Sequence, residues 1–183
     1  MGTKKSGGVV YPNDQQAEKN TSMKASTISE LKQELATIPA PQLTELCLRL
    51  AKFKKENKEL LTYLLFEAHD TNGYIQSVKN EIAAQFEGLN QSNVYFIKKS
   101  LRKILRITNK YIRYSGLPIV EIELLLYFCS SMTELNVSIN SNQILLNIYK
   151  NQLEKTEQAI AGLHEDLQYD YLKALKKAKE SCS

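Results

Sequence analysis

The feature that most constrains the fold is the spacing of apolar residues, which recur at every third or fourth position through most of the 183-residue chain. That spacing places apolar side chains on one face of a helix, whereas a half-buried strand needs strict alternation, which no stretch of the sequence shows. Only 7 Gly and 4 Pro interrupt the pattern, and 43% of the residues are hydrophobic, enough to build a core. The sequence therefore predicts an all-α fold, a single compact bundle of about six or seven helices.

The beginning of the chain differs in composition from the rest. Residues 1–25 show no apolar period and include three Gly, Pro12 and the polar run Asn13–Gln16, which is typical of a disordered leader. No apolar segment of a secretory signal follows Lys4 and Lys5. The chain also lacks a run of about 18 uninterrupted apolar residues, so we expect no membrane partner. We expect a cytoplasmic protein with a disordered leader, residues 1–25, and an all-helical domain, residues 26–183.

Local signals predict two helices directly after the leader. Thr27 and Glu30 form a capping box before a first helix that ends ahead of Pro39, and Pro41 suits the first turn of a second. The polar run 54–59 is expected to bend or break that second helix. Two apolar stripes are expected to be buried, namely Leu43, Leu46, Cys47, Leu50 and Phe53, then Leu60, Leu61, Leu64 and Leu65. The same core role is expected for the aromatic residues Phe53, Tyr63, Phe66, Tyr127, Phe128 and Tyr149.

The remaining helices are read from the same spacing. The segment Ile119–Met132 is apolar on nearly every side, so we expect it to be the central helix of the bundle. The run Asn136–Gln143 is rich in Asn and Ser, whose side chains bond their own backbone, and is expected to be a loop. Gly162 is expected to kink the last helix. The expected bounds are 75–89, 92–115 with Ser92 as its cap, and 145–175.

The chain carries none of the short motifs of catalysis or cofactor binding, such as a nucleophile elbow, a phosphate loop or a zinc motif. Its three cysteines are far apart and are expected to be reduced thiols. His69 and His164 each lie beside acidic residues, but neighbouring residues of a helix point in different directions, so we expect solvated surface groups. The sequence therefore predicts no catalytic residue, no metal site and no cofactor. An enzyme assembled from distant residues around His69 and His164 is a second alternative.

Positive charge is concentrated in one predicted helix. Leu89–Val120 holds seven basic residues and no acidic one, whereas the rest of the chain has 17 basic and 20 acidic residues. On a helical wheel the seven cations fall within about 140°, and the apolar residues fall on the opposite side. Tyr95 lies inside the basic sector and Tyr114 on its flank, where their rings could stack on bases or contact cations. The cations are Lys98, Lys99, Arg102, Lys103, Arg106, Lys110 and Arg113.

This charge pattern favours an anionic partner, because like charges four residues apart on a helix repel each other. We predict a non-catalytic binding module that presents the basic side of this helix to nucleic acid through its phosphates. The alternative is a helical protein-protein interaction scaffold whose basic helix meets an acidic protein or acidic residues of its own chain. A basic side open to water favours nucleic acid. Cover by Glu154, Glu157, Glu165 or Asp166 favours the scaffold.

The chain shows two resemblances to known proteins, one over a short segment and one over residues 26–183. Ser26–Leu50 resembles the helix-loop-helix SAP motif of DNA-binding proteins, with Leu31, Lys32, Leu35, Leu46, Arg49 and Leu50 in similar roles, but its loop is shorter and lacks Gly-x-Lys. As a whole, residues 26–183 resemble conserved bacterial all-helical proteins of unknown function. The segments LAKFKKENKELLTYLLFEAHD (Leu50–Asp70) and KKSLRKILRITNKYIRYS (Lys98–Ser115) carry that resemblance. It implies no activity, cofactor or site residue.

Overall fold

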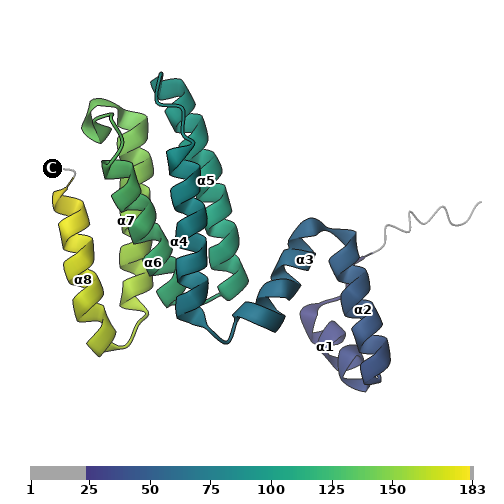
Figure 1. Cartoon of the computed structure of the whole chain (residues 1–183). Coiled ribbons are helices and arrows are strands. Elements are labelled where there is room, and N and C mark those ends of the chain that lie inside the picture. Colours follow the sequence, from purple (N-terminus) through teal and green to yellow (C-terminus); the bar gives the residue numbers. More distant parts are fainter. Residues whose placement is uncertain (1–23, 182–183) are drawn as a thin grey trace, which may run out of the picture. The chain divides into compact units, whose positions relative to one another are not determined.

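The computed structural model describes residues 24–181, so the predicted leader lies almost wholly outside the described residues. Within this range the chain forms eight α-helices and no strand, which confirms the all-α class (Figure 1). The number is higher than predicted because residues 145–175, expected to be one kinked helix, lie in two separate helices. None of the described helices is both long enough and apolar enough to cross a membrane.

Three short helices and a π-helical turn come first: α1 (Ile28–Thr37), α2 (Ala40–Phe53), α3 (Lys55–Thr62) and η1 (Tyr63–Glu67). The predicted capping box is present, since the Thr27 backbone N–H donates to Glu30 Oε2 at 2.7 Å and the Glu30 N–H donates to Thr27 Oγ1 at 3.3 Å. Lys54 has an extended backbone between α2 and α3. The polar run therefore breaks the helix, as predicted.

The prediction that these first helices carry core residues is wrong. None of α1, α2 and α3 contains a buried residue. Leu50 is 61% exposed, Phe53 77% and Phe66 67%, whereas Tyr63 of η1 is buried. The apolar spacing correctly gives the apolar side of each helix, but burial also needs a second element to pack on that side. Exposure likewise overturns the predicted burial of Leu46, Leu64 and Leu65, and Leu43, Cys47, Leu60 and Leu61 are only half-buried.

Five longer helices carry the core: α4 (Thr71–Glu87), α5 (Val94–Ser115), α6 (Pro118–Thr133), α7 (Gln143–Ala161) and α8 (Glu165–Glu180). Helix α6 packs against the other four, which lie around it in Figure 1. Ile122, Leu125 and Phe128 of α6 are fully shielded from solvent. The prediction of a central apolar helix is confirmed, because a helix that is apolar on nearly every side must be covered on every side.

Helix boundaries differ from the predicted ones where a side chain caps the backbone. Asp70 caps α4, so this helix begins at Thr71 and not at residue 75, and Asn93 caps α5 in place of Ser92. Helix α5 ends at Gly116, whose left-handed φ of 63° favours glycine. Residues 162–164 separate α7 from α8, and His164, whose backbone is extended, caps α8. The expected loop before α7 contains one turn of 3-10 helix, η2 (Ile139–Ser141).

Contacts divide the chain at Leu46, within α2, into two compact units. The first unit includes α1 and the beginning of α2. The second includes the end of α2, η1 and helices α3 to α8, together with every buried residue of the described range. All sites discussed below lie within the second unit.

Candidate nucleic-acid interface

Helix α5 packs on one side only. It contacts α4, α6 and η1, and its buried residues repeat at helical spacing on that side. The one polar residue among them, Thr108, donates its hydroxyl proton to the Ile104 carbonyl at 3.0 Å, which satisfies the buried group. The buried set is Ile97, Leu101, Ile104, Thr108 and Ile112. The opposite side of α5 carries the predicted cations.

Most of these cations are exposed and form no ion pair. The five exposed residues are Lys99, Arg102, Lys103, Arg106 and Arg113, and Lys98 is half-buried. Within the described range, none of these six has an ion-pair partner. We call the surface formed by these six side chains the basic face. It runs from Lys98 to Arg113, about 22 Å along the helix axis at about 1.5 Å per residue.

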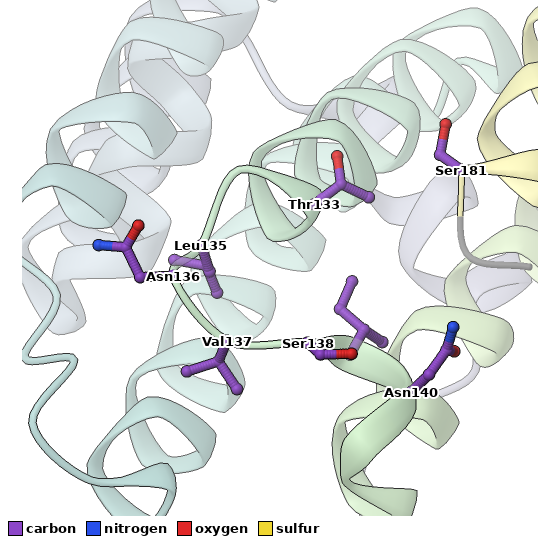
Figure 2. A pocket seen from close by; sticks show the side chains of 8 residues that line it. Thr133, Leu135, Asn136, Val137, Ser138, Asn140 and Ser181 are labelled. Carbon is purple, nitrogen blue, oxygen red and sulfur yellow. The ribbon is translucent and has the colours of Figure 1, made fainter.

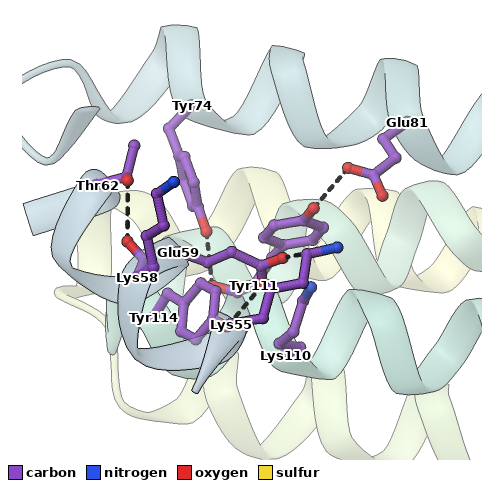
Figure 3. Close-up of polar contacts among 9 residues, drawn as sticks. All are labelled: Lys55, Lys58, Glu59, Thr62, Tyr74, Glu81, Lys110, Tyr111 and Tyr114. Atoms are coloured by element: carbon purple, nitrogen blue, oxygen red, sulfur yellow. Dashed lines mark hydrogen bonds and ion pairs between the residues drawn. The ribbon is translucent and has the colours of Figure 1, made fainter. Parts of the chain in front are cut away.

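The seventh cation, Lys110, is neutralised within the protein (Figure 3). Its Nζ lies 2.7 Å from Oε2 of Glu59 in α3, and the Tyr114 hydroxyl donates to the same carboxylate at 3.0 Å. The hydrogen bond from Lys110 holds the pKa of Glu59 below its usual value, although partial burial opposes this. Burial first, and then the bond to Glu59, raise the pKa of Tyr114 to about 12. The Tyr114 hydroxyl therefore stays protonated near neutral pH.

A second tyrosine beside this pair is held in the same way. The Tyr111 hydroxyl donates to Glu81 Oε2 at 2.6 Å, and the Tyr74 hydroxyl donates to the Tyr111 carbonyl at 2.9 Å (Figure 3). These contacts join α3 and α4 to the last turns of α5. The structure thus engages Lys110 and Tyr114 in contacts with Glu59, and we leave both out of the proposed interface.

The acidic residues that would have covered the basic helix lie elsewhere. Glu157 of α7 pairs with Lys179 of α8, with 2.8 Å between carboxylate oxygen and Nζ. In the described part of the chain, no ion pair joins Glu154, Glu157, Glu165 or Asp166 to α5. Among the described residues, the acid that forms an ion pair with α5 is Glu59. Sequence reasoning did not single it out, because Glu59 and Lys110 are 51 positions apart.

One exposed aromatic residue was also missed. Phe96 is 44% exposed and lies next to Tyr95, which is 62% exposed. Their ring centroids are 5.5 Å apart and their planes are inclined at 76°. Phe96 falls about 160° from Lys98 on the helical wheel, at the border of the basic sector. The wheel itself could have identified it as a neighbour of the cations.

A hollow of about 230 Å³ lies at the connection between α6 and α7, but its lining carries no reactive group. Figure 2 shows the hydroxyl groups of Thr133 and Ser138 and the amide of Asn140 around it. No carboxylate, amine or imidazole is among the lining residues. Neutral groups of this kind offer a catalytic mechanism neither a general base nor a nucleophile with a base beside it.

The two histidines have separate positions. His69 lines a small hollow with Glu67 and Asp70 where η1 meets α4, and His164 caps α8. No hydrogen bond or ion pair of the described residues joins the two places. Nor do the described residues contain a group of three His, Cys, Asp or Glu side chains that could hold a metal ion. The basic face is therefore the strongest candidate site.

Comparison with known proteins adds no further candidate. No protein-family model, curated protein or solved structure matches the chain. The fold and the site define an all-helical protein with an exposed cationic helix face. What this face binds is inferred below from its charge and geometry.

Proposed function

We propose that the protein is a non-catalytic helical binding module that holds nucleic acid by its phosphates on the basic face of α5. One observation carries this proposal: five exposed cations share one side of a helix, and within the described residues none of them is neutralised by an ion pair. The segment Leu89–Val120 that contains them has no acidic residue. An array of cations without counter-charges is the electrostatic footprint of a phosphate-binding surface.

The spacing of the cations fits a polyanion better than a single small anion. Lys99, Arg102 and Arg106 follow each other at steps of three and four residues, which places them about 4.5–6 Å apart along the axis. Like charges at this spacing destabilise a helix by about 0.2–0.5 kcal/mol for each pair. A chain of phosphates would relieve that repulsion at several positions at once and release its own condensed counterions.

The proposal is tested by reversing charge on the basic face. In the variant Lys99→Glu/Arg102→Glu/Arg106→Glu the local charge changes by six units, and no buried residue is altered. Binding of a labelled 20-nucleotide oligonucleotide is followed by fluorescence anisotropy at several salt concentrations. If about five phosphates are neutralised, the wild-type log-log slope should be about −3.5 to −4.5, at about −0.7 to −0.9 per phosphate. The variant should lose both affinity and slope.

A matched control distinguishes the effect of the basic face on binding from the effect of the net charge. Lys173, Lys176 and Lys177 are exposed on α8, and their reversal to glutamate gives the same net charge as the first variant. The control should bind like the wild type, and both variants should keep their helical circular dichroism. Weak, salt-independent binding that is equal in wild type and triple variant would overturn the proposal.

A second candidate function is a scaffold that binds an acidic protein through the same helix. One observation favours it: the Lys110 ammonium is already neutralised by a glutamate from another helix. Poly-glutamate serves as the probe, compared with the oligonucleotide at equal charge and salt. Tighter binding of poly-glutamate would favour the scaffold, whereas tighter binding of the oligonucleotide supports a nucleic-acid partner.

A further inference from the structure

The first turn of α5 exposes two aromatic rings next to the basic face. Tyr95 and Phe96 both project from the helix into solvent, and their rings meet edge to face. Together the two rings form an aromatic patch that borders the cations of the basic face. Neither ring belongs to the core that α5 shares with α4 and α6.

The two rings and the first cations form one continuous surface. Lys99 lies four residues after Tyr95 and three residues after Phe96, the two spacings that bring side chains together on a helix. Arg102 follows on the next turn of the same side. A strand whose phosphates contact Lys99 and Arg102 would therefore place its neighbouring bases at the aromatic pair.

Aromatic rings and cations select different features of a nucleic acid. Phosphates are present on single strands and duplexes alike, so the cations alone do not distinguish them. The flat faces of the bases are covered by stacking within a duplex but are accessible in a single strand, where aromatic side chains bind them. Resting on the proposed function, we propose that this site takes single-stranded nucleic acid, with bases stacked on Tyr95 and Phe96 and phosphates held by the basic face.

The test compares a labelled 20-nucleotide oligo-dT with a 20-base-pair duplex at the same salt concentration. Wild-type protein should bind the single strand more tightly. The variant Tyr95→Ala/Phe96→Ala should bind it about 5- to 150-fold more weakly for each base that loses its ring, with the salt slope and the duplex affinity unchanged. The variant Tyr95→Phe/Phe96→Tyr should retain binding, because both positions keep a ring.

Tyr169 provides a matched control, because it is 74% exposed on α8, which packs on α6 and α7. Tyr169→Ala should leave both affinities unchanged. Unaltered oligo-dT binding by the double alanine variant, while the triple charge reversal still abolishes binding, would overturn the stacking proposal and leave the proposed function standing. Equal binding by the triple charge reversal and the wild type would overturn the proposed function itself. If the double variant does not fold, each single alanine variant is measured instead.

Discussion

The helices before Asp70 and those after it are all amphipathic or apolar, yet they differ sharply in burial. Helices α1, α2 and α3 contain no buried residue, although α2 carries four leucines and a phenylalanine. Helices α4 to α8 contain almost the whole core, centred on α6. The difference shows that an apolar stripe becomes core only where other helices surround it, as four helices surround α6. Exposed apolar side chains in α1 to α3 should therefore contribute little to the stability of the fold.

The largest effect is expected from a charge placed in α6. Leu125→Asp should give unfolded or insoluble protein, because an unpaired buried charge costs several kcal/mol against a total stability of about 5–15 kcal/mol. The same change at exposed Leu50 of α2 should alter the free energy of unfolding by no more than about 0.5 kcal/mol. Urea denaturation followed by circular dichroism measures both. A folded Leu125→Asp variant would contradict the claim that α6 is core and α2 is not.

A smaller loss is expected at the polar contact that joins three helices of the bundle. Glu123 of α6 accepts hydrogen bonds from Lys79 Nζ of α4 at 2.6 Å and from the Tyr171 hydroxyl of α8 at 2.8 Å. Glu123→Gln should lower the free energy of unfolding by about 1.5–3 kcal/mol, since charge-assisted bonds are replaced by weaker ones. Glu157→Gln, which alters an exposed pair, is the control and should cost about 0.2–1 kcal/mol. Equal losses would mean that partial burial does not strengthen the Glu123 contacts.

Acid should weaken the same contacts. Burial acts to raise the pKa of Glu123, but the bonds from Lys79 and Tyr171 outweigh it and hold the pKa below its usual 4.5. The pKa of Glu59 is also lowered. A carboxylate whose pKa is lower in the folded state stabilises the protein above its unfolded pKa, and this contribution is lost as the pH falls. Unfolding free energy should therefore decrease below about pH 4.5, and Glu59→Gln/Glu123→Gln should flatten that decrease in urea titrations.

The smallest effect is expected at Gln152, which carries an unsatisfied hydrogen-bond acceptor within the core. Gln152 of α7 is buried and donates its Nε2 proton to the Ile148 carbonyl at 3.2 Å, but its Oε1 has no hydrogen-bond partner among the described residues. Gln152→Met should raise the unfolding free energy by up to about 1 kcal/mol, because it removes that buried acceptor. Gln158→Met, at an exposed position of the same helix, is the control and should change nothing. A loss of stability at Gln152 would show that its amide is needed where it lies.

Much of the fold could be predicted because its determinants are local. The capping box at Thr27, the break before Lys55 and the glycine that ends α5 each depend on a few adjacent residues. The break between α7 and α8 was predicted only as a kink at Gly162. That prediction considered only Gly162, and glycine weakens a helix by about 1 kcal/mol. The acidic residues in the first turn of α8 also favour a new helix start, and the two local effects together break the helix.

The candidate site was predictable in part for the same reason. Exposure of Lys99, Arg102 and Arg106 follows from the helical wheel, because the apolar side of α5 had to be the buried one. The capture of Lys110 by Glu59 did not follow, since the two residues are 51 positions apart and meet only where α3 lies beside α5. Nothing local distinguishes Lys110 from the other cations of the helix.

The sequence by itself determined that this chain is helical, which helix is apolar on nearly every side, and that one helix carries the positive charge on one side. Those properties depend on the intrinsic geometry of a helix, 3.6 residues per turn, and on the order of the side chains. Only the tertiary structure decided which apolar sides are covered and which cations remain exposed. Burial and ion pairing require surfaces from distant parts of the chain, and the spacing within one helix carries no information about what lies opposite it.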